Sequence, residues 1–254
     1  MIMGTGRKII FVIALMVFIG SLGVIINHYV TGWRAEKALT DLGALKSGEK
    51  DLVTEKGIVD GKYAALYKKN PDIIGWIKVK GTGIDYPVMQ TQSDPEFYLR
   101  RSYEKKYSIS GVPFLDAYSD VFKPTLNWLI YGHNMKDGTM FHDLLDYAEE
   151  DFYKAHKTIR FDTIYKGGGG RYKVVAAFYS QIYPENKNVF KYYTYADLNS
   201  DREYKEYIEG VKKLSEYDTG VDAVPGDQLI TLSTCSYHVP DKLGRFAVVA
   251  KKIK

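Results

Sequence analysis

The chain has 254 residues, with 35 lysines and arginines against 31 aspartates and glutamates, for a formal charge of +4. This length can bury a hydrophobic core of ordinary size in one main domain with an extension. The basic residues are scattered, without an arginine-rich tract or a stacked aromatic and basic motif, which excludes a nucleic-acid-binding protein.

The first predicted element is an apolar helix near the amino terminus. Arg7 and Lys8 precede residues 9–26, IIFVIALMVFIGSLGVII, which carry no charge. At 1.5 Å per residue such a helix spans about 27 Å, close to the roughly 30 Å hydrocarbon core of a membrane. Two aromatic residues suited to the membrane interface follow it, Tyr29 and Trp33. The basic flank predicts that residues 1–8 are cytoplasmic and that the body of the protein is exported.

This segment has two other interpretations. A cleaved signal peptide would have a shorter apolar run followed by an A-x-A-like site, and the sequence shows no clear site of that kind. A buried core helix would not combine this length with a basic flank at the start of the chain. We therefore expect a retained anchor that tethers the protein to the membrane.

Residues 27–70 are charged and mixed in composition, and they predict a stalk that leads into a helix packed on the main domain. Helix-like stretches occur at WRAEKAL and KYAALYKKN. The pair Asn70-Pro71 ends the second stretch, because the residue before a proline is driven out of the helical conformation.

From residue 71 to residue 254 the sequence is mainly of the strand type. Runs rich in β-branched and aromatic residues alternate with clusters of Gly, Pro and Asp. These runs are residues 73–79, 84–90, 126–132, 158–162, 171–182, 227–235 and 245–253. Short strands at uneven spacing indicate a closed or nearly closed barrel rather than parallel βαβ units.

Two helices are predicted to interrupt these strands. Residues 139–156 repeat apolar side chains at the i, i+3, i+4, i+7 spacing of a helix. Residues 200–215 open with Ser200 and Glu203 at the spacing of a capping box. The glycine-rich stretch KGGGGR at 166–171 precedes no helix and lacks the Lys-Ser/Thr end of a phosphate loop, so it predicts a hairpin turn.

The only cysteine, Cys235, stands where an apolar strand gives way to a polar loop, in TLSTCSYHVPDKLGRF at 231–246. Exported proteins usually use cysteines in disulfides, and one cysteine cannot form a disulfide within the chain. Cys235 is therefore a buried small hydrophobe, an intermolecular link or a reactive group. A free thiol with a pKa near 8.5 is only a few per cent thiolate at neutral pH, so a reactive Cys235 needs a base.

Five histidines could supply that base: His28, His133, His142, His156 and His238. The first follows the apolar helix, and the two within residues 139–156 are expected on a solvated helix face. His238 lies three residues after Cys235, whereas His133 ends the apolar strand LNWLIYG. A rigid strand end open to substrate suits a catalytic group, but spacing alone does not choose between these two histidines.

Arg245 begins the last strand, ten residues after Cys235. Its guanidinium stays charged and offers several donors, which suits it to a substrate carbonyl or a developing oxyanion. The alternative role is a charge that protects a strand edge from pairing with another chain.

Several segments together resemble the sortases, membrane-anchored cysteine transpeptidases of Gram-positive bacteria. The sortase-like segments are LIYGHN at 129–134, TLSTC at 231–235 and the arginine at 245, in the order His, Cys, Arg; papain-like peptidases place Cys before His. The segments similar to class B sortases are DYPVMQ at 85–90, YGHNMKDGTMF at 131–141 and RFAVVAKKIK at 245–254. The resemblance covers roughly residues 71–254.

This resemblance implies a mainly β fold: an eight-stranded sortase-type barrel over 71–254, with amino-terminal helices and a helix inserted between late strands. It implies that Cys235 is the nucleophile, that His133 is the acid and base, and that Arg245 stabilises the oxyanion or positions the substrate backbone. The weaker candidates for substrate binding flank these residues: Tyr131, Ser233 and Thr234. No role passes to His238, and some class B members have Asn at the place of Asp85.

The implied reaction cleaves an NPxTx-like carboxy-terminal sorting signal at its Thr through a thioacyl enzyme and joins the surface protein to a peptidoglycan amino group. The expected partners are surface proteins with such a signal, a peptidoglycan precursor and the membrane, with the catalytic domain at the outer cell surface. One alternative is a pilin polymerase that uses a lysine as acceptor. Another is a membrane-tethered barrel that binds wall components without catalysis. No cofactor is implied, and the sequence contains no HExxH or calcium loop.

Overall fold

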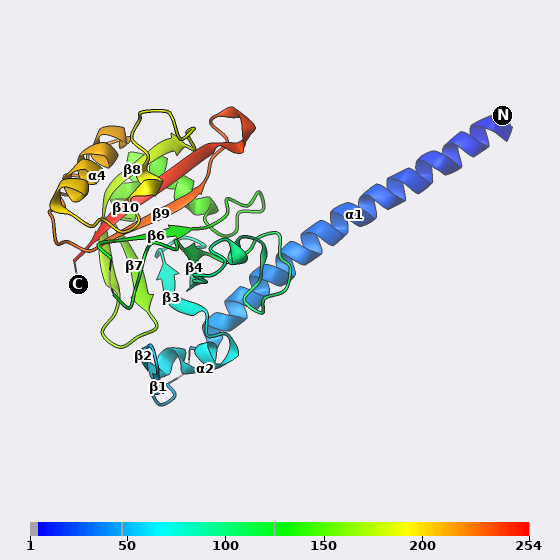
Figure 1. Ribbon diagram of the computed structural model, residues 1–254. Coiled ribbons are helices and arrows are strands. Elements are labelled where there is room, and N and C mark those ends of the chain that lie inside the picture. The colour runs from blue at the N-terminus through cyan, green and yellow to red at the C-terminus, as the bar shows by residue number, and fades with distance from the viewer. Residues whose placement is uncertain (1–4, 47, 124, 254) are drawn as a thin grey trace.

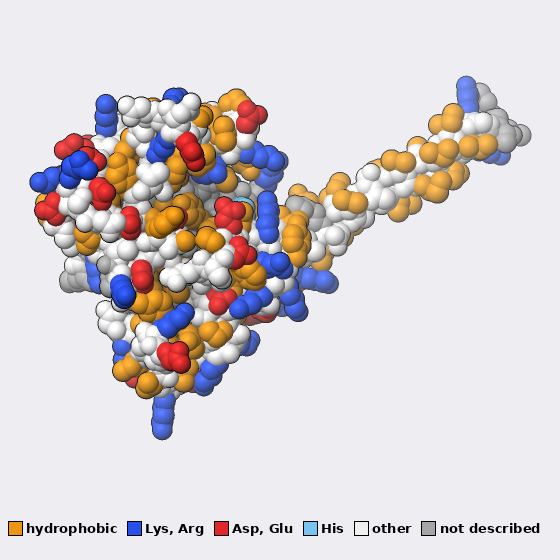
Figure 2. All heavy atoms as spheres, viewed as in Figure 1, with side chains coloured by type: hydrophobic (Ala, Val, Ile, Leu, Met, Phe, Trp, Pro, Cys, Tyr) orange, Lys and Arg blue, Asp and Glu red, His pale blue; other side chains and the backbone are white. Residues whose placement is uncertain are grey.

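The computed structural model describes residues 5–46, 48–123 and 125–253. Its longest helix, α1 (Thr5–Ala44), projects away from a body built around one β-barrel (Figure 1). The side chains of residues 9–26 are all exposed, and Figure 2 shows them as a hydrophobic surface along the projecting part of α1. By length and composition this helix could cross a membrane, a property that membrane anchors share with signal sequences.

The stretch predicted as a stalk begins as a continuation of the apolar helix. WRAEKAL extends α1 without a break, and the last turns of α1 dock on the barrel, where Leu39 and Leu42 are buried. In the same contact, the Tyr86 hydroxyl donates a hydrogen bond to the Glu36 carboxylate at 3.2 Å. The extension of the apolar helix is therefore anchored to the barrel by both apolar and polar contacts.

A short hairpin and a second helix connect α1 to the barrel. The hairpin consists of β1 (Leu52–Thr54) and β2 (Gly57–Val59), and α2 (Gly61–Lys69) follows it. Asn70 ends α2 with φ −148°, which confirms the predicted break before Pro71. The buried Asn70 amide also donates to the Tyr98 hydroxyl at 2.7 Å, so the helix end is tied to the core.

Eight strands form a closed barrel, which confirms the predicted fold class. They are β3 (Ile73–Lys78), β4 (Asp85–Met89), β5 (Phe114–Leu115), β6 (Asn127–Tyr131), β7 (Thr158–Thr163), β8 (Gly170–Gln181), β9 (Leu229–Cys235) and β10 (Gly244–Lys252). Their order around the barrel is β10-β8-β7-β3-β4-β5-β6-β9. The pairs β4–β5 and β6–β9 are parallel and the others are antiparallel.

Seven of these strands coincide with the predicted runs, and β5 was not predicted because its two residues are too short for a recognisable pattern. The glycine-rich stretch forms the turn between the antiparallel strands β7 and β8, as expected. Gly169 has φ +86°, and a Cβ there would lie 2.4 Å from the Asp162 Cα, so only glycine fits.

The single helix predicted over residues 139–156 is wrong. The structure has a 3₁₀ helix (His142–Ala148) followed by the short α3 (Glu150–Ala155), with Glu149 extended between them at ψ 124°. The fully buried side chains here are Phe141, directly before the first segment, and Leu144 and Tyr147 within it. Their three-residue spacing matches a 3₁₀ helix rather than an α-helix, because a 3₁₀ helix has three residues per turn.

The other predicted helix is confirmed as α4 (Asp201–Leu214), which lies between β8 and β9 in the chain and packs against β8 on the outside of the barrel (Figure 1). Ser200 caps it, since its hydroxyl accepts a hydrogen bond from Glu203 N at 3.2 Å, and the Glu203 carboxylate accepts one from Asn199 N at 2.9 Å. The buried face carries Tyr204, Tyr207, Ile208 and Val211.

Replacing Ser200 with alanine is expected to destabilise the protein by about 1 kcal/mol, because the amide of Glu203 loses its capping acceptor. Urea unfolding measures this change, with Ser200→Asp as the matched control because aspartate keeps an acceptor at the same place. An alanine variant as stable as the wild type would contradict the capping role.

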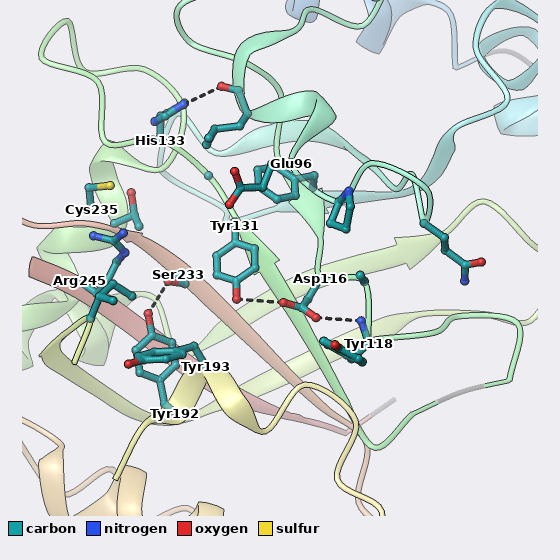
Figure 3. A pocket seen from close by; sticks show the side chains of 18 residues that line it. Glu96, Asp116, Tyr118, Tyr131, His133, Tyr192, Tyr193, Ser233, Cys235 and Arg245 are labelled. Carbon is teal, nitrogen blue, oxygen red and sulfur yellow. Dashed lines mark hydrogen bonds between the residues drawn. The ribbon is translucent and has the colours of Figure 1, made fainter. Parts of the chain in front are cut away.

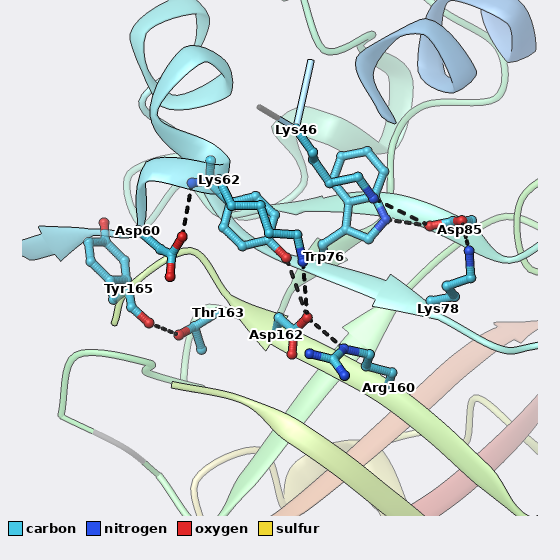
Figure 4. A network of polar contacts seen from close by, with 11 residues as sticks. Lys46, Asp60, Lys62, Trp76, Lys78, Asp85, Arg160, Asp162, Thr163 and Tyr165 are labelled. Carbon is cyan, nitrogen blue, oxygen red and sulfur yellow. Dashed lines mark hydrogen bonds and ion pairs between the residues drawn. The ribbon is translucent and has the colours of Figure 1, made fainter. Parts of the chain in front are cut away.

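Asp85, at the start of β4, belongs to a polar network on the outside of the barrel (Figure 4). Its carboxylate accepts a hydrogen bond from Trp76 Nε1 at 2.6 Å and pairs with Lys78. Lys46, just beyond α1, lies over the Trp76 ring at 3.7 Å. Asp85 therefore links the end of α1 to the barrel wall.

Candidate active site

The pairing of three strands brings the ends of β6, β9 and the start of β10 to one edge of the barrel. β6 and β9 are parallel, with Tyr131 opposite Ser233, and Gly132 N donates to Ser233 O at 3.0 Å. His133 follows the end of β6 by two residues, and Cys235 ends β9 two residues after Ser233. β10 runs antiparallel to β9 and places Arg245 opposite Cys235. The strand register alone therefore gathers the three predicted catalytic residues.

All three residues line one cavity of about 680 Å³. Figure 3 shows them along one wall of it, with Cys235 between His133 and Arg245. The three candidates for substrate binding also line this cavity: Tyr131, Ser233 and Thr234. The structure thus places all six predicted site residues around one hollow.

Cys235 is the last residue of β9, free and only partly buried. Its carbonyl oxygen accepts a hydrogen bond from Asn134 Nδ2 at 3.1 Å, and the next amide, Ser236 N, donates to Gly244 O at 2.9 Å. The backbone on either side of the thiol is thus held by both neighbouring strand ends, while the side chain faces the cavity.

His133 is mostly buried, and its Nε2 lies 2.8 Å from the carbonyl oxygen of Leu99. A carbonyl oxygen only accepts, so Nε2 must carry the proton and the neutral ring has an unprotonated Nδ1. Burial lowers the pKa of His133, the bond to Leu99 acts in the opposite direction, and the charge of Arg100 adds to the lowering. At neutral pH His133 is therefore a neutral ring able to accept a proton at Nδ1.

The folded state lowers the pKa of His133 and so favours the neutral ring. The resulting contribution to stability is complete above the ordinary histidine pKa near 6.5, and it is lost as the pH falls through the lower pKa of the folded state. We expect His133→Gln to lose less stability than the wild type when the pH drops below 6.5. Urea midpoints of the variant and the wild type, measured in parallel at several pH values, test this. Parallel curves for His133→Gln and the wild type would contradict it.

Arg245 Nη1 donates to the backbone oxygens of Lys242 and Gly244, at 3.0 and 2.8 Å. Within residues 5–46, 48–123 and 125–253, no ion pair joins Arg245 to a carboxylate. The guanidinium is therefore anchored at one nitrogen and keeps its positive charge beside Cys235. Such an unpaired cation suits a developing oxyanion.

The hydroxyl groups below Cys235 are already paired with one another and with a carboxylate. Tyr131 donates to an Asp116 carboxylate oxygen at 3.0 Å, and Tyr192 and Ser233 share a hydrogen bond at 2.7 Å. Burial raises the pKa of Tyr131, and the charge of Asp116 adds to this. Burial also raises the pKa of Tyr192 to about 12. Both tyrosines thus stay protonated and shape the cavity.

Thr234 differs from these residues because its hydroxyl oxygen is buried and has no hydrogen-bond partner among the described residues. Sequence reasoning missed the other residues that line the cavity, among them Glu96, Asp116, Tyr192 and Tyr193. Glu96 precedes a short 3₁₀ helix, Asp116 follows the two-residue strand β5, and both tyrosines lie in a 3₁₀ helix of three residues, so each segment is too short for a periodic pattern.

The other histidines have different surroundings. The ring of His156 stacks on Phe152 with centroids 4.0 Å apart, and His238 bonds to the Ser236 hydroxyl at 2.9 Å. The side chain of His28 lies outside the described part of the structure. Among the described residues, no group of three or more His, Cys, Asp or Glu side chains could hold a metal ion.

The sortase domain family matches residues 77–253. Sortase B of Staphylococcus aureus is 34% identical over 194 residues, which are 76% of this chain and 75% of the relative. Among solved structures, a Staphylococcus aureus sortase B-substrate complex aligns with TM-score 0.66 and 33% identity, over 77% of this chain and 86% of that one.

Sortase B from B. anthracis in complex with AAEK1 aligns with TM-score 0.74 and 30% identity, over 89% of this chain and 99% of that one. These similarities cover the barrel together with the cavity at its edge. The chain belongs to the sortase family of transpeptidases and, within it, to the sortase B group.

Proposed function

We propose that this protein is a cysteine transpeptidase that cleaves an NPxTx-like sorting signal of surface proteins at Thr and joins them to a peptidoglycan amino group. One observation carries the proposal: the only thiol of the chain shares a cavity with His133 and with Arg245, which forms no ion pair with a carboxylate among the described residues. The neighbour described as a sortase B-substrate complex supports a substrate bound in this barrel.

In the first half-reaction Cys235 Sγ attacks the carbonyl carbon of the Thr residue in the signal. The thiol proton moves to His133 Nδ1, the S–C bond forms, and the carbonyl oxygen becomes an oxyanion facing Arg245. The C–N bond then breaks, and His133 returns the proton to the leaving amine. The products are a thioacyl enzyme and the free tail of the signal.

In the second half-reaction the acceptor amine attacks the thioester. His133 Nδ1 takes a proton from the attacking nitrogen, the new amide bond forms, and the C–S bond breaks. The same proton passes to Sγ and restores the thiol. Splitting the transfer into two steps lowers each barrier.

The long apolar helix α1 supports a location of this reaction at the membrane. We propose that residues 9–26 of α1 span the membrane with residues 1–8 in the cytoplasm, so that the barrel works outside the cell. The surface protein and the peptidoglycan precursor then meet the active site close to the membrane surface.

The test uses the full-length chain in detergent micelles with a quenched fluorescent peptide that carries an NPQTN-type signal. Cleavage is followed by fluorescence, and mass spectrometry of the products with added amines identifies the acceptor. A peptidoglycan-stem amine and a lysine-bearing pilin peptide compete as acceptors. If the wild type cleaves no member of a panel of sorting peptides and Cys235 resists alkylation, the non-catalytic wall-binding barrel becomes the better account.

A further inference from the structure

Asn134, directly after His133, joins the backbone of Cys235 to the side chain of His142. Its side-chain Nδ2 donates to the carbonyl oxygen of Cys235 at 3.1 Å, and its Oδ1 lies 2.8 Å from His142 Nδ1. Neither Asn134 nor His142 lines the cavity. Their contacts therefore act on the catalytic strands and not on a substrate in the cavity.

The bond to Cys235 replaces a backbone bond that a continued β6–β9 ladder would have. Gly132 N donates to Ser233 O, and in a parallel ladder the next bond with its donor on the β6 side would run from Asn134 N to Cys235 O. The side-chain amide of Asn134 supplies this bond instead. The backbone after His133 is thus free to turn away toward Met140, with which Asn134 forms an isolated bridge, while the two strand ends stay joined.

Simple hydrogen-bond rules determine the orientation of the amide and the protonation of His142. The Cys235 carbonyl only accepts, so the Asn134 atom facing it must be the nitrogen, and the oxygen must face His142. An amide oxygen also only accepts, so His142 Nδ1 must carry a proton. His142 therefore has its proton on Nδ1, the opposite of the Nε2 proton on His133.

We propose that Asn134 is a positioning residue that holds Cys235 level with His133, and that His142 locks the Asn134 amide in the donating orientation. This proposal deepens the proposed transpeptidase reaction and rests on it. A loss of the side-chain bond would let the β6 and β9 ends separate beyond Gly132, and a misplacement of about 1 Å between reacting groups can cost about 10²-fold in rate.

The first test measures kcat and KM for peptide cleavage by the full-length protein. Asn134→Ala and Asn134→Asp are each expected to lower kcat by about 10²-fold with KM changed less than about threefold. Asn134→Asp has the same size but presents a second acceptor to the Cys235 carbonyl, so wild-type kcat in this variant would overturn the proposal.

The second test separates the role of His142 from simple packing. His142→Asn places an amide nitrogen where Nδ1 stood and is expected to keep wild-type kcat, whereas His142→Ala and His142→Gln are expected to lower kcat about tenfold. The double variant Asn134→Ala/His142→Ala should be no slower than Asn134→Ala, because His142 acts through Asn134. Additive losses, or equal activity of the three single His142 variants, would contradict this chain of contacts.

The third test needs no substrate and so separates this inference from the proposed function. Nitrogen NMR of 15N-histidine-labelled protein at alkaline pH reports which ring nitrogen is protonated. The wild type should show His142 with Nδ1–H and His133 with Nε2–H, and Asn134→Ala should change only the His142 pattern. A His142 ring protonated at Nε2 in the wild type would overturn the inference even if the enzyme is active, whereas a silent enzyme with the expected pattern would overturn only the proposed function.

Discussion

Replacing Cys235 with alanine is expected to reduce peptide cleavage by about 10⁴-fold or more, because the covalent route disappears with the thiol. No second cysteine exists in the chain to replace it. Two hydroxyls directly precede it in β9: that of Ser233 is hydrogen-bonded to Tyr192 at 2.7 Å, and that of Thr234 is buried. The residual rate should therefore be only what substrate binding and the remaining oxyanion donor provide without a nucleophile.

The measurement is steady-state cleavage together with intact-protein mass spectrometry. The wild type should accumulate an adduct with the mass of the acyl fragment, and Cys235→Ala should show none. His238→Ala is the matched control, because His238 lies close in sequence but does not line the cavity, and it should keep wild-type turnover. An adduct that persists in Cys235→Ala would identify a different nucleophile.

Stability should not explain the loss in Cys235→Ala. The thiol is partly exposed at the cavity wall, so its removal leaves no large void in the core. The backbone bonds that hold this position come from Asn134 Nδ2 and Ser236 N and do not involve the thiol. The urea midpoint of the variant should therefore stay close to that of the wild type.

The sequence predicted the barrel well because most of its strands are long apolar runs bounded by turn residues. β8 (Gly170–Gln181) and β10 (Gly244–Lys252) are of this kind. β5 has two residues and is defined only by its neighbours β4 and β6. The 3₁₀ helix was missed because a spacing of three residues over seven positions also fits an amphipathic α-helix.

Local spacing in the sequence cannot decide whether His133 or His238 is the base for Cys235. His238 is nearer to Cys235 in the sequence, but the parallel pairing of β6 and β9 brings the end of β6 beside the end of β9, so that His133 and not His238 lines the cavity with the thiol. A parallel pairing between residues a hundred positions apart leaves no local signal. The resemblance to the sortases pointed to His133 because of the order of the three residues, and the register gives the physical reason.

Replacing Arg245 with alanine is expected to lower kcat/KM by about 10²- to 10³-fold, the cost of losing one oxyanion donor. Arg245 lies opposite Cys235 in the β9–β10 ladder and is anchored through Nη1 by two backbone oxygens. This anchoring means that its remaining N–H groups are held in place before the charge develops on the substrate oxygen. Preorganised donors stabilise the transition state without further rearrangement.

Arg245→Lys distinguishes a positioned fork of donors from a simple positive charge. A lysine ammonium carries its three N–H donors on one nitrogen, so it cannot hold the Lys242 and Gly244 oxygens with one nitrogen and present a second nitrogen to an oxyanion, as the guanidinium can. We expect Arg245→Lys to recover no more than about tenfold of the loss in Arg245→Ala. Arg171→Ala, which removes an arginine of β8 that does not line the cavity, is the matched control and should be fully active.

The division of the Arg245→Ala effect between kcat and KM decides which of its two proposed roles is correct. Stabilisation of the oxyanion exists only in the transition state, so its loss lowers kcat and kcat/KM together. Positioning of the signal's backbone acts already in the bound substrate, so its loss raises KM with kcat unchanged. The location of the unpaired guanidinium beside the thiol, at the reacting bond rather than at the far end of the cavity, favours the first result. A variant with wild-type kcat and a raised KM would assign Arg245 to substrate binding and leave the oxyanion to other donors.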